Sequence, residues 1–146
     1  MSVSISEQIS VKLQKMASPQ AVDSLVRGIA EGLLGEIKTR IHEEGKNAKG
    51  GQIGTYSYQY LLRRQKPPFN RTSDRKVILS LTGQMENDFK VIGLGNSSYG
   101  LGFSNSFNAD KAEWNEERYG KIYATTPDEK KLIHAEINDW IARTFK

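Results

Sequence analysis

The sequence predicts an α+β fold in which a long N-terminal helix and a C-terminal helix pack on a small antiparallel sheet. Three observations predict this class: a helical apolar pattern after Ser18, a glycine-rich region of short alternating segments over residues 79–103, and a second helical pattern after Thr126. Helices on either side of a run of strands are typical of helices packed on an antiparallel sheet. At 146 residues we expect one domain over 1–146.

The strongest helical pattern runs from Ser18 to Gly45. Ser18 is a good N-cap, Pro19 suits the first helical position, and Gly45 is a typical stop. Apolar residues recur at spacings of three and four at Val22, Leu25, Val26, Ile29, Leu33, Leu34, Ile37 and Ile41. The pattern predicts one amphipathic helix whose charged residues, Arg40 among them, lie in water. Before it, residues 1–17 predict either a short helix or an arm, since Ser4 and Glu7 have capping-box spacing.

Three short segments predict strands: "VILSL" at 77–81, "FKVIGL" at 89–94 and "YGLGF" at 99–103. The polar residues "GNSS" between the last two predict a four-residue hairpin turn, so these two strands should pair antiparallel. Gly100 and Gly102 leave one face of the last strand bare. We expect this face to pack closely against a helix or a neighbouring subunit.

Two further helices are expected near the C-terminus. A weak pattern covers 109–118, with Asn108 as the cap and Gly120 as the stop. The stronger one opens with Thr126 as the cap, Pro127 at the first position and Glu129 three residues after the cap, which is the spacing of a capping box. This helix should run to the end of the chain or nearly so.

The segment 45–76 stands apart by its charge. It holds eight Lys or Arg residues and one acid, Asp74, whereas the whole chain has a net charge of +4. Pro67 and Pro68 disfavour a helix around them, so we expect a long basic loop that gains its order from a partner. Its candidate subunit-interface or DNA-channel residues are Arg63, Arg64, Lys66, Arg71, Arg75 and Lys76. The candidate packing or interface residues are Tyr56, Tyr58, Tyr60, Gly100 and Gly102.

The sequence shows no pattern of an enzyme. It has no cysteine, and no glycine between 83 and 102 is followed by the Lys-Ser or Lys-Thr of a phosphate loop. His42 and His134 each lack a second ligand at metal-binding spacing. Acidic residues at 113, 116 and 117 form either an acid–base cluster or, as we expect, a solvated helix face. The prediction is a non-enzymatic protein without cofactor or metal, and without a membrane span of about 20 apolar residues.

Nucleic-acid binding is the main alternative from composition. The basic segment interleaves cations with Tyr56, Tyr58, Tyr60 and Phe69, and this combination offers charge for phosphates and rings for base stacking. The other interpretation is that the aromatic residues pack inward while the cations are solvated or meet an acidic protein surface. A small basic DNA-binding protein therefore remains the second hypothesis.

Three stretches taken together resemble a known family. They are "IKTRIHEEGKNAKGGQIGTYSYQYLLRR" at 37–64, "LSLTGQMENDFKV" at 79–91 and "ATTPDEKKLIHAEINDWI" at 124–141. In this order they resemble the virion-morphogenesis or tail-completion proteins of tailed bacteriophages. The chain departs from that pattern after the hairpin, where "KAEWNEERYGKIYA" at 111–124 has no histidine, and before the last helix, where an aromatic-rich segment is replaced by "YATTPDE".

The resemblance implies a structural part of a virus particle. Proteins of this family form rings, commonly hexamers, at the junction of capsid and tail, and the genome passes through the lumen. The implied partners are other copies of the chain, neighbouring connector, tail-terminator or tail-tube proteins, and genomic DNA contacted without sequence preference. The implied location is the virion, assembled in the cytoplasm of a bacterial host.

Overall fold

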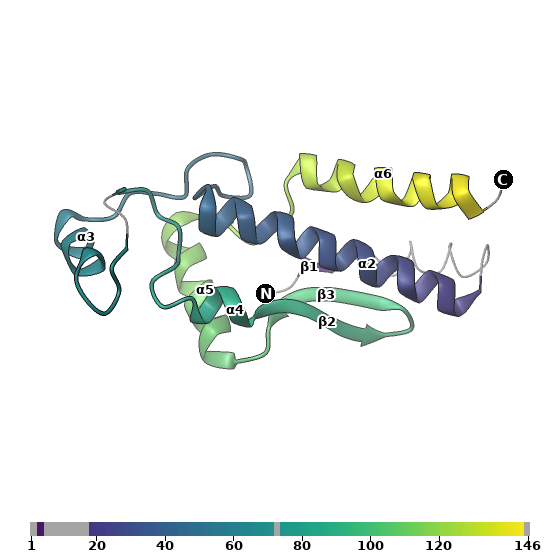
Figure 1. Cartoon of the computed structure of the whole chain (residues 1–146), viewed down its shortest axis with the longest axis horizontal. Helices are drawn as coiled ribbons and strands as arrows, with labels where there is room; N and C mark the ends of the chain where they lie inside the picture. Colours follow the sequence, from purple (N-terminus) through teal and green to yellow (C-terminus); the bar gives the residue numbers. More distant parts are fainter. Residues whose placement is uncertain (1–2, 5–17, 72–73, 145–146) are drawn as a thin grey trace.

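The structure is a computed structural model that describes residues 3–4, 18–71 and 74–144 (Figure 1). Its helices are α2 (Pro19–Lys38), α3 (Tyr58–Gln65), α4 (Gln84–Asp88), α5 (Ser106–Tyr119) and α6 (Pro127–Thr144), with a π-helical turn η1 (Thr39–Glu43) after α2. Its strands are β1 (Val3–Ser4), β2 (Phe89–Gly95) and β3 (Ser98–Phe103). The predicted α+β class is confirmed. Apart from β1, the expectation for residues 1–17 lies outside the described residues.

Helix α2 is the long helix that the sequence predicts. The Ser18 side chain accepts a hydrogen bond from the N–H of Ala21 at 3.2 Å, and Pro19 follows as the first helical residue. The side chains that α2 buries are Val22, Val26, Ile29, Ala30, Leu33 and Ile37. The helix continues into η1, and the chain then turns at Gly45, whose φ is +65° and whose Cβ position would lie 2.7 Å from the Val77 carbonyl oxygen. Glycine is therefore required at this stop.

The sheet has the strand order β1–β3–β2, and both pairs are antiparallel. Phe89 lies opposite Phe103 and Val91 opposite Leu101, as the predicted hairpin requires. The turn is shorter than the predicted four residues, because strand pairing extends to Gly95 and Ser98. The residues left in the turn are Asn96 and Ser97, with φ of 51° and 56°. Positive φ at both central positions is the geometry of a type I′ turn, which suits the twist of paired strands.

Helix α2 lies between the hairpin and α6. It packs on β2 and β3 on one side and on α6 on the other, so the two long helices and the sheet form layers (Figure 1). The segment that carries α3 projects at one end of an elongated molecule, and the C-terminus lies at the other end (Figure 1). No helix in the described ranges is both long and apolar enough to cross a membrane.

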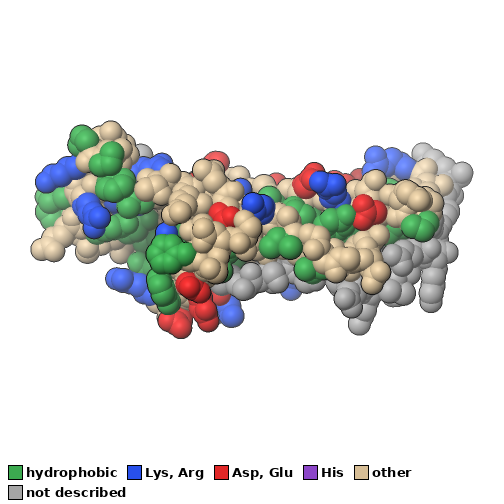
Figure 2. All heavy atoms as spheres, turned by 90° about the horizontal axis from the view of Figure 1, so that it is seen from below, with side chains coloured by type: hydrophobic (Ala, Val, Ile, Leu, Met, Phe, Trp, Pro, Cys, Tyr) green, Lys and Arg blue, Asp and Glu red, His purple; other side chains and the backbone are tan. Residues whose placement is uncertain are grey.

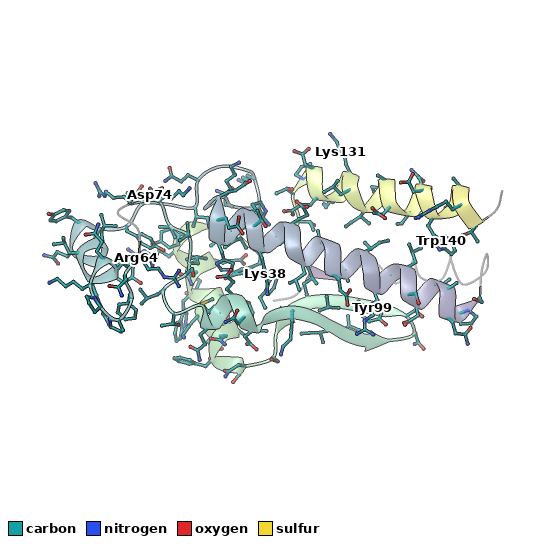
Figure 3. The ribbon with its side chains drawn as sticks, viewed as in Figure 1. Lys38, Arg64, Asp74, Tyr99, Lys131 and Trp140 are labelled. Carbon is teal, nitrogen blue, oxygen red and sulfur yellow. The ribbon has the colours of Figure 1, made fainter. Side chains whose placement is uncertain are left out.

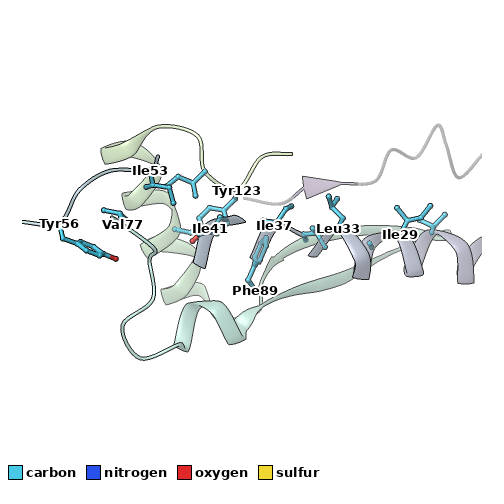
Figure 4. Packing of buried hydrophobic residues seen from close by; sticks show 14 of the residues in the cluster. Ile29, Leu33, Ile37, Ile41, Ile53, Tyr56, Val77, Phe89 and Tyr123 are labelled. Atoms are coloured by element: carbon cyan, nitrogen blue, oxygen red, sulfur yellow. The ribbon is translucent and has the colours of Figure 1, made fainter. Parts of the chain in front are cut away.

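The core is continuous from the hairpin to the projecting segment (Figure 4). Phe89, Phe103 and Tyr123 form an aromatic group beneath α2, with ring centroids 5.1 to 5.4 Å apart. At the other end the core includes Ile53, Tyr56 and Val77 from the chain around α3. The basic segment is therefore attached to the same core as the rest of the chain.

The predicted strand at 77–81 is wrong. The N–H groups of Ile78 and Leu79 both donate to the Tyr56 hydroxyl at 3.2 Å, and Leu79 has a φ of 50°. A strand would need extended φ and would spend these N–H groups on a neighbouring strand. Beside this stretch Lys76 forms an isolated bridge with Thr55, and the Val77 N–H donates to the Gly54 carbonyl at 3.0 Å.

The expected long loop 45–76 is also wrong in part, because it contains α3. The Ser57 side chain caps this helix by accepting from the N–H of Tyr60 at 3.3 Å, and Lys66 ends the helix just before Pro67. Hydrogen bonds within the chain hold both ends of the segment, from the Tyr56 N–H to the Arg75 carbonyl at 2.7 Å and from the Arg71 N–H to the Arg64 carbonyl at 2.8 Å. Both described parts of the segment are therefore fastened within the chain.

The two C-terminal helices form as expected, with one shifted boundary. Helix α5 begins at Ser106 and not at 109, because Asn105 and not Asn108 supplies the cap, accepting from the N–H of Phe107 at 2.9 Å. Asn108 is buried and donates to Asp88 at 3.1 Å instead. The start of α6 has the predicted capping box, in which Thr126 and Glu129 each accept from the other's N–H at 3.1 and 2.8 Å.

Candidate functional site

The candidate residues of the basic segment divide into anchors and exposed residues. Arg64 is an anchor, because it is 2% exposed and its Nη2 donates to the Ser80 carbonyl at 2.8 Å. Its guanidinium carbon lies 4.4 Å from the ring centroid of Tyr56 and 5.8 Å from that of Tyr60. Figure 3 shows Arg64 on the side of α3 that faces the rest of the chain. The expectation that Arg64 meets a neighbour or DNA is therefore corrected.

Tyr56 packs against Arg64 and is the second residue of this anchor. It is buried, and its hydroxyl accepts the two N–H groups of Ile78 and Leu79. Burial raises the pKa of Tyr56, while the two N–H donors and the Arg64 charge act in the opposite direction. The phenol therefore stays protonated at neutral pH and serves packing within the chain. The Tyr60 ring packs beside it at a centroid distance of 5.1 Å and is tilted by 58° to the Tyr56 ring.

Three more of the predicted basic-patch residues have partners inside the chain. Arg71 donates from Nε to the Leu81 carbonyl at 2.9 Å, and Arg75 donates from two nitrogens to the Tyr56 carbonyl at 3.2 and 3.3 Å. Lys76 forms an ion pair with Asp74 at 3.7 Å. Arg71 and Arg75 thus fasten the segment through backbone carbonyls, whereas Lys76 pairs only with its near neighbour Asp74. All three are less available to an outside ligand than the sequence suggests.

Two cations of the segment remain on the surface beside exposed apolar residues. Arg63 and Lys66 are exposed, as are Tyr58 at 66% and Leu62 at 39%. Tyr58 and Leu62 are four residues apart and so share one side of α3, next to the buried side that holds Leu61 and Arg64. We call Tyr58, Leu62, Arg63 and Lys66 the α3 surface. Three of these residues, Tyr58, Arg63 and Lys66, are candidates from the sequence.

A second exposed surface lies on α5 and was missed by the sequence prediction. Phe107 is 54% exposed and Trp114 57% exposed, and their rings meet edge to face at a centroid distance of 6.5 Å. On one flank of these rings lie the exposed carboxylates of Asp110, Glu113 and Glu117. We call these five residues the α5 surface. Figure 2 shows acidic side chains beside hydrophobic ones in this region, and basic side chains at the end that holds α3.

The carboxylates at 113, 116 and 117 do not act as one cluster. Glu116 is bound within the chain, because its Oε1 accepts the N–H groups of Ile122 and Tyr123 at 2.9 Å. Glu113 and Glu117 line an open hollow of about 580 Å³ together with Asp110 and Lys121. Among the described residues none of these three exposed carboxylates forms an ion pair. The solvated face that we expected is therefore the arrangement observed for Glu113 and Glu117.

The other flank of the α5 rings is basic. Lys111 lies 4.5 Å from the Phe107 ring centroid and donates to Gln84, and Arg118 lies over the Tyr119 ring at 5.3 Å. Both cations line an open groove of about 670 Å³ between α5 and the α3 segment. At the groove's edge Gly54 allows the Tyr119 ring to approach, since a Cβ at position 54 would lie 2.8 Å from a ring carbon.

The remaining candidates are structural. Gly100 and Gly102 are both buried, on the face of β3 opposite to Leu101. His42 is buried too, and its Nδ1 lies 3.0 Å from the Ile78 carbonyl oxygen. His134 is exposed on α6, and the described residues contain no group of three or more His, Asp or Glu that could hold a metal.

Arg40 is a buried residue that the sequence pattern placed in water. It is 7% exposed and donates to Glu129 Oε1 at 2.7 Å and to the carbonyls of Ile122, Ala124 and Lys46 at 2.9, 3.0 and 3.2 Å. Glu129 therefore divides its two carboxylate oxygens between the start of α6 and Arg40 in η1. No local sequence signal marks this pair, because its members are 89 residues apart.

Comparison of the chain with protein-family models, with curated proteins and with solved structures gives no match.

Proposed function

We propose that this protein is a structural subunit of a tailed-phage particle that acts in tail completion or head–tail joining. In this role it binds other copies of itself and neighbouring virion proteins, forms a ring at the capsid–tail junction, and catalyses no reaction. The proposal starts from the resemblance of residues 37–64, 79–91 and 124–141 to that family.

The observation that carries the proposal is the state of α3. The helix is fastened to the core by Tyr56 and Arg64, yet it presents Tyr58 and Leu62 to solvent beside unpaired cations. Exposed apolar side chains on a firmly held element favour a protein partner, because little ordering entropy is lost when such a surface binds. A ring subunit needs surfaces of this kind.

The test is loss and rescue of particle joining in a phage whose copy of this gene is disrupted. We expect electron micrographs to show DNA-filled heads and separate tails, and we expect the wild-type chain supplied from a plasmid to restore joined, infective particles. A Tyr58→Ala/Leu62→Ala variant should fold, as judged by circular dichroism, and fail to restore joining. Normal yields of joined particles without the chain would contradict the proposal.

A small basic DNA-binding protein is the alternative, and duplex binding at low and high salt separates the two. A DNA binder holds duplex in dilute salt and loses it steeply as salt rises, since phosphate contacts release counterions. With Arg64, Arg71 and Arg75 bonded inside the chain, we expect only weak binding of a fluorescent duplex at about 50 mM salt. Tight binding with a steep salt dependence would support the alternative instead.

A further inference from the structure

We infer that the α3 surface of one copy docks on the α5 surface of a second copy. This inference deepens the proposed function, and it rests on it in taking the partner to be this same chain. It assigns a role to Phe107, Asp110, Glu113, Trp114 and Glu117, and it gives the basic α3 surface an acidic counterpart.

The first reason is that both surfaces have an exposed apolar half. Tyr58 on α3 and Phe107 and Trp114 on α5 are each more than half exposed in the single chain, and Leu62 on α3 is 39% exposed. Large aromatic side chains bury about 150–250 Å² each when they are covered, and Trp and Tyr are enriched among the residues that contribute most to protein interfaces. Contact between the two halves would cover all four side chains together.

The second reason is that the charged halves are opposite in sign and are not neutralised in their own chain. Arg63 and Lys66 flank the apolar side of α3, and Asp110, Glu113 and Glu117 flank the rings of α5. None of these five residues belongs to an ion pair of the described residues. Charge complementarity of this kind speeds association and fixes which flank of α5 faces the α3 cations.

The third reason concerns which flank of α5 is free. Lys111 and Arg118 lie on the other flank, toward the groove beside the chain's own α3 segment. Lys111 and Arg118 would repel Arg63 and Lys66 of the second copy, so docking is favoured only over the acidic flank. The acidic flank also disfavours a nucleic acid as the occupant, because phosphates would meet three carboxylates.

The contact joins different surfaces on the two copies, so it is heterologous. A bound pair still presents one free α3 surface and one free α5 surface, and further copies can add until the assembly closes on itself. The contact therefore has the symmetry that a ring requires.

The experiment reverses the charges on each surface in the full-length chain. We expect Arg63→Glu/Lys66→Glu and Glu113→Lys/Glu117→Lys each to weaken self-association by roughly tenfold or more in sedimentation velocity at low salt, because like charges then face each other. The matched control is Lys130→Glu/Lys131→Glu on exposed positions of α6, which should leave association unchanged. Circular dichroism confirms that each variant is folded.

Mixing the two reversed proteins gives the decisive result. A copy with reversed α5 retains a wild-type α3 surface, and a copy with reversed α3 retains a wild-type α5 surface. The equimolar mixture should therefore regain association, although each protein alone does not associate. A mixture that stays monomeric, a wild-type chain that stays monomeric, or reversed variants that associate normally would each overturn the inference.

This result is separate from the test of particle joining. If charge reversal leaves association intact but heads and tails still need the chain, the docking inference fails and the proposed function stands. If the mixture regains association but the chain is dispensable for joining, the contact stands and the phage role fails.

Discussion

At the scale of single residues, two arginines show how the chain uses its cations. Arg64 and Arg40 are both nearly inaccessible, and both donate to backbone carbonyls from distant parts of the chain. Guanidinium groups suit this use because they carry several fixed donors and are more weakly hydrated than ammonium groups. Part of the positive charge in the sequence therefore stabilises the fold.

His42 makes stability depend on pH in a predictable direction. A carbonyl oxygen only accepts, so Nδ1 carries the hydrogen that bonds to Ile78. Burial lowers the pKa of His42 below its ordinary value of about 6.5, although the Ile78 hydrogen bond and the charge of Glu86 oppose the shift. Below that value the unfolded chain binds a proton that the folded chain resists. We expect the free energy of unfolding to fall as pH drops from about 7.5 to about 5.

Urea unfolding at several pH values measures this effect. His42→Gln keeps a donor for the Ile78 carbonyl but does not titrate, so its stability should change less over the same pH range. His134→Gln is the control, since His134 is exposed on α6 and its variant should follow the wild-type pH dependence. Identical slopes for wild type and His42→Gln would show that His42 is not responsible.

At the scale of elements, the start of α6 depends on a carboxylate with two functions. Glu129 caps the helix through the Thr126 N–H and neutralises Arg40, and both side chains of the ion pair are 7% exposed. Removing one partner of a buried pair leaves a charge without compensation, which typically costs about 3–5 kcal/mol. Glu129→Gln keeps the cap and removes the charge, so we expect a loss of about 3 kcal/mol in the free energy of unfolding.

An exposed pair provides the comparison for this prediction. Arg27 and Glu31 lie 3.4 Å apart on α2 with side chains about 60% exposed. Glu31→Gln should cost no more than about 0.5 kcal/mol, because water screens such pairs. Similar small losses for both variants in urea unfolding would mean that the buried pair is not a major contributor to stability.

Elements with strong local signals could be predicted from the sequence. Helix α2 has a cap, a first-position proline and a regular apolar pattern, α6 has a capping box, and the hairpin has alternation and a polar turn. Each of these signals acts over a few residues, so the sequence alone reveals it. The α+β class follows from their order along the chain.

The rest depends on contacts between distant residues. Residues 77–81 have the composition of a strand, but the Tyr56 hydroxyl takes two of their N–H groups. The sequence pattern did not predict helix α3, because Pro67 and Pro68 favour an extended path. Ser57 is nevertheless the cap at which this helix starts. At the candidate site, the sequence predicted the cations Arg63 and Lys66 as candidates, and both are exposed. The burial of Arg64 and the exposure of Trp114 depend on packing between distant residues, which the sequence pattern does not reveal.

At the scale of the whole molecule, one core joins every layer. The buried cluster includes Val26 of α2, Leu101 of β3, Ala112 of α5 and Val77 near the basic segment. A single contiguous core favours cooperative unfolding. We therefore predict that the chain unfolds as one domain. Tryptophan fluorescence and far-ultraviolet circular dichroism should then give the same urea midpoint. Two separated transitions would instead indicate that the α3 segment or α6 unfolds on its own.

The close approach of Gly54 and Tyr119 has a consequence for how the chain can evolve. A side chain at position 54 meets the tyrosine ring, so Gly54 cannot be replaced while Tyr119 stays in place. Related chains should keep glycine and tyrosine together, or exchange both at once for a larger residue at 54 and a smaller one at 119. Substitutions at positions 54 and 119 would then occur together in related chains.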